Sequence, residues 1–111
     1  MVDRIKLVQN DTGPQIRVVL SDQVTGNPID LTGATVTLNF REVDGTTALF
    51  SRLAFINPEY APSGIAYIEW EPGDLDVPAG DYEGEIEVVN ATGARETIYE
   101  KLRFRVREEI A

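Results

Sequence analysis

The sequence predicts an all-β fold, an antiparallel β-sandwich of about seven strands, in a single domain over residues 1–111. Three observations predict it. Apolar and polar residues alternate with a period of two along most of the chain, turn signals separate these runs at regular spacing, and no stretch shows a convincing helical pattern. A chain of 111 residues suits one domain and buries roughly 65% of its unfolded surface, which is enough for a two-layer core.

The longest alternating stretch, residues 80–106, predicts a long β-hairpin around a turn at residues 90–93. The outward row of its first strand is acidic and consists of Glu83, Glu85 and Glu87. The outward row of its second strand is basic and consists of Lys101, Arg103, Arg105 and Arg107. Facing residues of an antiparallel pair keep the same parity, so we expect the two rows to lie opposite one another. Two hypotheses stay open, a solvated face that sets the strand register or a docking face for a partner protein.

The remaining strands are predicted from shorter runs, at residues 4–9, 15–21, 34–43 and 65–70. Their main inward positions are Ile16, Val18, Leu20, Val36, Leu38, Phe40, Ala66, Ile68 and Trp70. Residues 46–56 fit either one face of a helix or a strand. We expect a strand, because the turn signal at Asp44 and Gly45 requires a returning partner. The connections close the core with Ile29, Leu31, Leu75 and Val77.

The composition excludes several function classes. The chain has no cysteine and no histidine, which removes disulfides, thiolate metal sites and every triad that relies on imidazole. Its formal net charge of −9 repels phosphate backbones and anionic lipid, so we expect neither nucleic acid nor a membrane as partner. The first residues lack the apolar region of a secretory signal, so we expect folding in a reducing cytoplasm.

Candidate catalytic chemistry is sparse, and the sequence predicts no enzyme, no cofactor and no metal. Asp74, Asp76 and Asp81 lie close in the sequence, and we expect them in a solvated turn. A calcium site built from their oxygens is the alternative, although the residues lack the regular spacing of a dedicated calcium loop. The glycines are spread along the chain and form no phosphate-binding cluster.

The aromatic residues divide into inward and outward positions. Trp70 and Tyr82 fall on inward positions, where we expect core packing. Tyr67 and Tyr99 fall on outward positions, where a large aromatic side chain marks a contact surface. Together with Arg103 and Arg105 they form the candidate interface.

The sequence at Tyr82 is similar to the tyrosine corner of immunoglobulin-like sandwiches. Tyr82 begins a strand just after a turn that contains Gly80, and in such corners the phenol hydroxyl bonds back to upstream backbone. We expect that backbone within residues 76–78. The predicted sandwich is therefore immunoglobulin-like, although the cysteine pair of antibody domains is missing.

Several motifs in order resemble the N-terminal domain family of phage baseplate upper proteins. They are the turn and strand over residues 25–41, and the stretches 63–70, 78–88 and 102–106. The resemblance implies a non-enzymatic virion protein, an adaptor, connector or decoration module in the tail, neck or baseplate that docks other particle proteins. It also implies several copies in a symmetric assembly and a location in the virion.

Two other classes of function stay open. A carbohydrate-binding module that contacts host-surface glycans would use Tyr60, Tyr67 or Tyr99 as stacking faces. A small hydrolase would use a pair of Asp and Glu side chains, since no histidine or cysteine is present.

Overall fold

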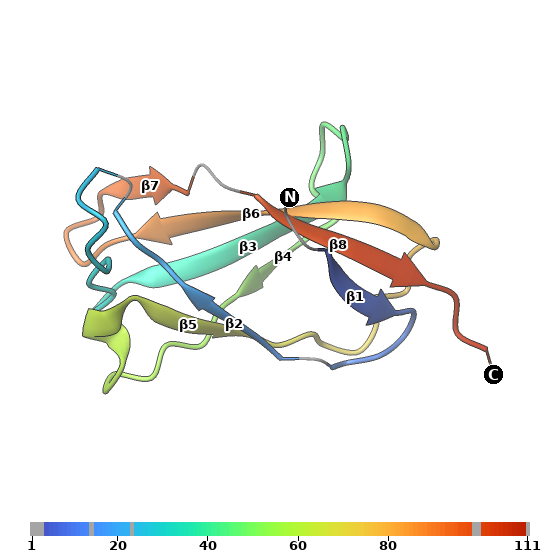
Figure 1. Ribbon diagram of the computed structural model, residues 1–111, viewed down its shortest axis with the longest axis horizontal. Coiled ribbons are helices and arrows are strands. Elements are labelled where there is room, and N and C mark those ends of the chain that lie inside the picture. The colour runs from blue at the N-terminus through green and yellow to red at the C-terminus, as the bar shows by residue number, and fades with distance from the viewer. Residues whose placement is uncertain (1–3, 14, 23, 99–100, 111) are drawn as a thin grey trace.

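The protein is a two-layer β-sandwich, and the predicted immunoglobulin-like all-β fold is confirmed (Figure 1). The computed structural model describes residues 4–13, 15–22, 24–98 and 101–110. Its elements are β1 (Ile5–Val8), β2 (Ile16–Val19), β3 (Thr35–Glu42), β4 (Phe50–Leu53), the 3-10 helix η1 (Ala61–Ser63), β5 (Ile65–Ile68), β6 (Gly80–Val89), β7 (Arg95–Thr97) and β8 (Leu102–Arg107). These are eight strands rather than about seven. Within the described ranges, no helix has the length and hydropathy that a membrane span requires.

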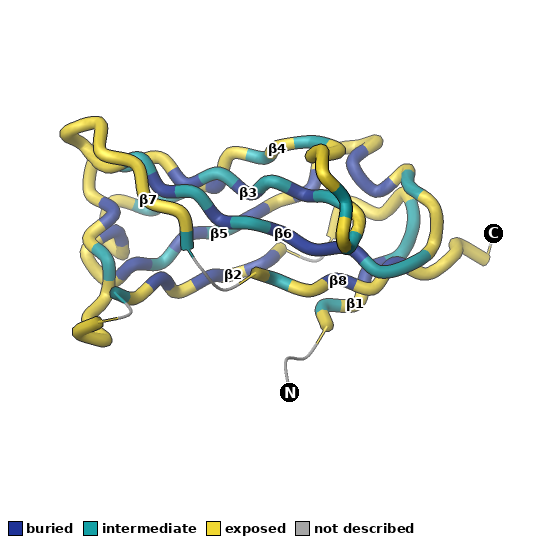
Figure 2. Tube along the Cα trace, turned by 90° about the horizontal axis from the view of Figure 1, so that it is seen from above, coloured by how far each residue is buried: buried dark blue, intermediate teal, exposed yellow. Residues whose placement is uncertain are grey.

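Six strands form the larger sheet, in the order β1-β8-β6-β3-β4, with β7 paired to the far half of β6. Figure 2 looks onto this sheet, with β1 and β4 at its two edges. Strands β2 and β5 form the smaller sheet, which lies beneath β6 and β3 in Figure 1. Every named pair is antiparallel except β1–β8, which is parallel. The predicted antiparallel sandwich therefore includes one parallel pair, at the edge where the first and last strands run in the same direction.

The predicted hairpin over residues 80–106 is divided into two paired segments. After the turn, β7 pairs with the end of β6, where Thr97 lies opposite Glu87. Pairing resumes in β8, where Leu102 lies opposite Gly84. The returning chain covers five positions where β6 covers three, so it holds two additional residues. An even number preserves the parity of the faces, which is why the predicted alternation survives this interruption.

The core lies between the two sheets and contains the predicted inward residues. Those of β2, β3 and β5 are all buried, and Figure 2 shows buried positions alternating with less buried ones along β3 and β6. An aromatic cluster surrounds Phe40, whose ring centroid lies 4.8 Å from Phe50, 5.1 Å from Tyr82 and 5.2 Å from Phe104. Leu31 and Leu75 are also fully buried, as expected for the connections that close the core.

The ambiguous stretch over residues 46–56 contains a strand, as predicted. Asp44 takes a positive φ of 63°, and the Gly45 N–H donates to the carbonyl of Glu42, which reverses the chain. Strand β4 then pairs with β3 and places Phe50 against the core. A helix would leave the edge of β3 without its hydrogen bonds, so the strand is favoured.

The tyrosine corner is also present. The Tyr82 hydroxyl donates to the carbonyl oxygen of Pro78 at 2.5 Å, within the predicted upstream segment. Burial raises the pKa of the Tyr82 phenol, and the nearby Glu42 carboxylate raises it further. This bond fixes the entry of the chain into β6.

Candidate functional site

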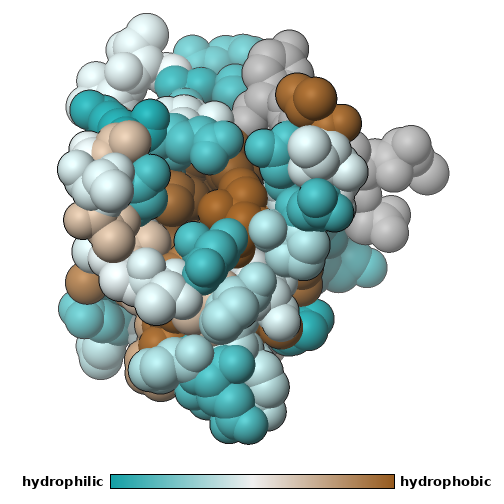
Figure 3. All heavy atoms as spheres, turned by 90° about the vertical axis from the view of Figure 1, so that its left-hand side faces the viewer, coloured by the Kyte–Doolittle hydropathy of each residue, from teal (hydrophilic) through white to brown (hydrophobic). Residues whose placement is uncertain are grey.

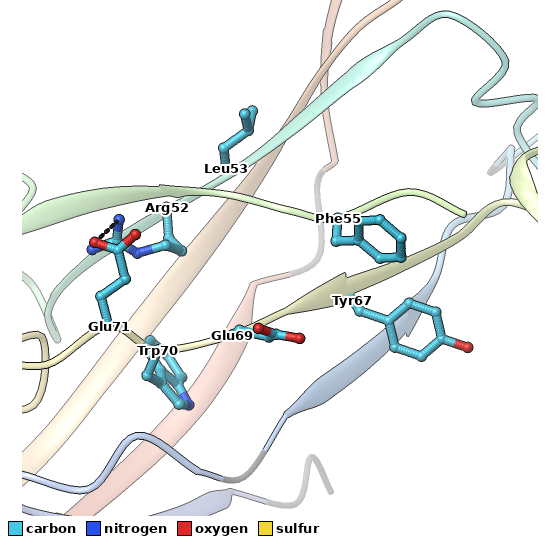
Figure 4. A pocket seen from close by; sticks show the side chains of 7 residues that line it. All are labelled: Arg52, Leu53, Phe55, Tyr67, Glu69, Trp70 and Glu71. Carbon is cyan, nitrogen blue, oxygen red and sulfur yellow. Dashed lines mark ion pairs between the residues drawn. The ribbon is translucent and has the colours of Figure 1, made fainter. Parts of the chain in front are cut away.

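A hollow of about 180 Å³ opens where the chain crosses from the larger sheet to the smaller one (Figure 4). Its walls come from the end of β4, the residue bridged to β5, and the end of β5. The lining residues are Arg52, Leu53, Phe55, Tyr67, Glu69, Trp70 and Glu71. The crossing exists because β4 belongs to the larger sheet while Phe55 pairs with the smaller one.

Phe55 and Tyr67 are held side by side by an antiparallel bridge. The Phe55 N–H donates to the Tyr67 carbonyl at 2.8 Å, and the Tyr67 N–H donates to the Phe55 carbonyl at 2.9 Å. Directly opposite residues of such a pair project to the same face. Figure 4 shows both rings pointing to the same side. The Phe55 side chain is 59% exposed, so the fold holds a large aromatic ring in solvent.

The apolar surface continues onto β2. Val19 lies opposite Ile65, and Arg17 lies opposite Tyr67. Val19 is exposed by 51%, and Ile65 and Tyr67 are half-buried. We call this surface the β5 face, and it consists of Val19, Phe55, Ile65 and Tyr67, with Arg17 and Glu69 as its polar rim.

One wall of the hollow is a fixed ion cluster around Arg52. Its Nε donates to Asp74 Oδ2 at 3.0 Å, and its Nη1 lies 3.1 Å from Glu71 Oε2. The backbone N–H of Glu71 also donates to Asp74 at 2.8 Å. Asp74 is buried, so the expected solvated turn is wrong at this residue: the arginine of β4 covers the carboxylate. Arg52 is therefore already neutralised by two carboxylates.

The alternative of a calcium site is not supported by this arrangement. Asp74 is bound to Arg52, whereas Asp81 lies on β6 and pairs with Arg105 at 3.1 Å. Across residues 4–13, 15–22, 24–98 and 101–110, no group of three or more acidic side chains is placed to hold a metal ion. Asp74 and Asp81 are therefore each engaged by a different arginine, Arg52 and Arg105, rather than by a shared cation.

Trp70 lies at the base of the hollow and belongs to the core, as predicted. It is 3% exposed, and its ring meets those of Phe40, Phe50 and Phe104 at steep angles. Its Nε1 atom is buried, with no hydrogen-bond partner among the described residues. Perpendicular aromatic contacts permit weak N–H···π bonding, which reduces the cost of an unpaired indole N–H.

The predicted charged face lies on the opposite side of the sandwich, on the outer surface of the larger sheet. Glu83 lies opposite Arg103, as the parity argument required. Glu83 is not solvated, however, because it is only 4% exposed. Its Oε1 accepts a hydrogen bond from Arg41 Nε at 2.7 Å, and the charged groups of Lys101 and Arg103 each lie 3.7 Å from its carboxylate. Glu87 faces Thr97 instead of the basic row, and it pairs with Arg95.

The structure does not gather the candidate interface residues on one surface. Tyr67 belongs to the β5 face, whereas Arg103 and Arg105 lie on the outer face of the larger sheet and pair with acidic residues of β6. Tyr99 lies outside the described residues. Of the tyrosines considered as glycan-stacking faces, Tyr67 lines the hollow and Tyr60 does not.

Phe55 is the site residue that the sequence reasoning missed. The strand alternation of Ala54 and Ile56 already placed the intervening Phe55 on an outward position. Residues 46–56 also fit a helical pattern, and Phe55 lies off the apolar face of that helix. Because neither pattern makes Phe55 a core residue, the choice between helix and strand did not single it out.

A second hollow, of about 170 Å³, opens at the end of the sandwich where β3 begins. It is lined by Leu31, Thr32, Gly33, Ala34, Ile56, Pro58 and Ala61. Figure 3 shows apolar atoms at the centre of this end, surrounded by hydrophilic residues. Beside it, the Thr32 hydroxyl and N–H both donate to the Asp30 carboxylate and lower its pKa. These bonds fix the loop and leave the hollow without a charged side chain.

The comparisons with known proteins support the fold. No protein-family model matches the chain, and no curated protein matches it either. Among solved structures, CopC from Methylosinus trichosporium OB3b matches over 97% of this chain and 87% of its own, with a TM-score of 0.53 and 9% sequence identity. At this identity, the likeness establishes a shared β-sandwich fold and nothing finer.

The expected phage role is contradicted by this comparison. A solved structure that matches is CopC of Methylosinus trichosporium OB3b, and no phage protein matches as a family or as a curated protein. The assignment to a phage tail, neck or baseplate is therefore wrong. The physical reason is that turns such as 25–34 and alternating strands such as 102–106 specify the sandwich, which unrelated proteins share, and not a role. The family resemblance itself, the protein partners, the virion location and the absence of enzymatic activity stay predictions.

Proposed function

We propose that this chain is a non-catalytic binding module that docks a protein partner on the β5 face. The observation that carries the proposal is the exposed ring of Phe55 beside Tyr67, on the same face as the exposed Val19, which lies opposite Ile65. Clustered large apolar side chains in solvent mark an interaction surface, whereas isolated ones do not. Aromatic residues supply much of the binding energy in protein interfaces.

The shape of the surface also favours a protein over a small ligand. The hollow of about 180 Å³ is below the 300–1,000 Å³ of typical ligand sites, and two of its seven lining residues, Arg52 and Glu71, are already paired with each other. The surrounding face is formed by paired strands whose backbone is fixed. Such a face presents side chains to a broad partner surface without a change of conformation.

A non-catalytic role is supported by the chemistry of the polar side chains. The chain holds no histidine and no cysteine. The two buried carboxylates, Asp74 and Glu83, are both bound to arginine side chains. Both carboxylates are therefore engaged in ion pairs within the fold and do not face an open site.

Copper is the metal that the likeness to CopC brings into question, and the residues of this chain do not fit it. Protein copper sites draw on imidazole, thiolate and thioether ligands. The chain has no histidine, no cysteine and a single methionine. The shared fold therefore carries no copper chemistry into the proposal.

The proposal is tested by retention of a partner on immobilised protein, followed by binding of the purified partner. Three versions are compared: wild type, Phe55→Ser and Arg103→Ser, the last as a control on the opposite face. We expect one partner that wild type and Arg103→Ser bind equally, and that Phe55→Ser binds at least about tenfold more weakly, since a buried phenylalanine contributes about 1.5–3 kcal/mol. A partner that Phe55→Ser binds as tightly as wild type would overturn the proposal.

A further inference from the structure

We infer that the β5 face binds a second copy of this chain, so that two molecules associate through a two-fold axis. The inference rests on the proposed function, because it names the partner of the same face. Its basis is the distribution of charge around the apolar residues, together with the regular geometry of the strands beneath them.

The β5 face is electrically balanced, unlike the protein as a whole. The full chain carries a formal net charge of −9, which would select a basic partner if the excess lay here. Instead, the rim of the face holds one cation and one anion, Arg17 and Glu69. In the hollow beside the face, Arg52 is shared between Glu71 and Asp74, so that group carries one net negative charge. Two copies can therefore approach through this face without bringing the acidic excess together.

The positions of Arg17 and Glu69 make the face self-complementary. Arg17 lies directly across β2–β5 from Tyr67, and Glu69 follows Tyr67 by two positions, so all three project to the same side. A two-fold axis brings a surface patch against itself, so that residue i of one copy meets residue j of the other and the reverse. Arg17 of each copy can then meet Glu69 of the other around a centre of Tyr67 and Phe55.

Both rim residues are available for such a contact. Glu69 accepts a hydrogen bond from Gln15 Nε2 to its Oε1 at 2.8 Å, and among the described residues its Oε2 has no partner. Arg17 is exposed on the outer surface of β2. The apolar residues at the centre supply the burial, and the two charged pairs fix the orientation.

The test is the molar mass of the purified chain by sedimentation equilibrium over about 5–500 μM, a range that covers the affinity expected of a small interface. We expect wild type to pass from monomer to dimer with concentration. Phe55→Ser and the independent variant Val19→Ser should raise the dissociation constant at least about tenfold, as expected for central apolar contacts. Arg103→Glu on the opposite face should leave it unchanged.

A charge exchange tests the two-fold pairing. Arg17→Glu alone and Glu69→Arg alone should each weaken the dimer, because each places like charges opposite one another. The double variant Arg17→Glu/Glu69→Arg should restore it. A wild type that stays monomeric at the highest concentration, or a double variant no better than the single ones, would overturn the inference. In that event a different partner that depends on Phe55 would still support the proposed function.

Discussion

The outer faces of the two sheets differ at two prominent positions, one where the side chain is paired within the fold and one where it is left exposed. On the larger sheet, Glu83 pairs with three cationic side chains that cover it, and it is only 4% exposed. On the smaller sheet, Phe55 and Val19 remain in solvent although an extensive core lies beneath them. Glu83 is therefore paired within the fold, whereas Phe55 and Val19 are left exposed; on the larger sheet, Leu53 of β4 is also 65% exposed. The comparison teaches that overall charge is a poor guide to where a protein binds.

The difference leads to opposite expectations for substitutions. Changes on or under the larger sheet should lower the free energy of unfolding and leave partner binding unchanged. Changes on the β5 face should weaken partner binding and leave the free energy of unfolding almost unchanged. Four substitutions test this separation, from the largest expected effect on stability to the smallest.

The largest effect is expected from Gly84→Ala, under the face of the larger sheet. A Cβ atom there would lie 2.5 Å from Leu38 Cδ1 and 2.9 Å from Phe104 Cε2, and both side chains are fully buried. Overpacking of this kind costs about 1–3 kcal/mol. Urea unfolding measures the loss, and Gly13→Ala, where a Cβ would have no neighbour within 4 Å, is the control. Equal midpoints for the two variants would contradict the description of the core.

The next largest effect is expected from Glu83→Gln, which removes the anion shared by Arg41, Lys101 and Arg103. We expect the free energy of unfolding to fall by about 2 kcal/mol, because hydrogen bonds to a buried charged group contribute more than exposed ones. Glu87→Gln on the same strand should lose no more than about 0.5 kcal/mol, since its partner Arg95 is 69% exposed. Urea unfolding at neutral pH separates them, and similar losses would show that burial of Glu83 has no energetic role.

A smaller effect, with a distinct pH dependence, is expected from Tyr82→Phe. Loss of the bond to Pro78 should cost about 1 kcal/mol at neutral pH. The pKa of Tyr82 is raised in the folded state, so its contribution is complete below the unfolded pKa of about 10 and is lost as the pH rises through the folded pKa. Unfolding measured at neutral and alkaline pH should therefore show that alkaline pH lowers the free energy of unfolding less in Tyr82→Phe than in wild type. Identical alkaline losses would contradict the raised pKa.

The smallest effect on stability is expected from Phe55→Ser. The side chain is 59% exposed, so the free energy of unfolding should change by less than about 0.5 kcal/mol. Thermal unfolding checks this value alongside the binding measurements. A loss of 2 kcal/mol or more would mean that Phe55 supports the fold and would remove the contrast between the two faces.

The local features of the fold were predictable from the sequence. Alternation fixed the inward positions Val36, Leu38 and Phe40, because a period of two leaves only one face for the core. The corner at Tyr82 was predictable because its hydroxyl bonds only four residues upstream. Parity placed Glu83 opposite Arg103 even though the predicted hairpin is interrupted.

The features that depend on distant segments were not predictable. Asp74 is buried by Arg52, which lies 22 residues earlier, and nothing near Asp74 in the sequence signals that partner. The parallel pairing of β1 with β8 joins segments from the two ends of the domain. The candidate site depends on the bridge between Phe55 and Tyr67, which forms only after the chain has changed sheets. Periodicity describes one strand at a time and carries no information on which strands meet.

The parallel pairing of β1 with β8 determines how the domain bears mechanical load. Ile5 lies beside Phe104 and Val8 beside Arg107, so a tension applied at Ile5 and Arg107 acts along the strands in opposite directions. The four register pairs are then loaded together in shear, so they must break together. A hairpin pulled from its open end would unzip pair by pair at lower force. Tension applied at Ile5 and Arg107 would therefore load β1 and β8 in shear rather than peel β1 away one pair at a time.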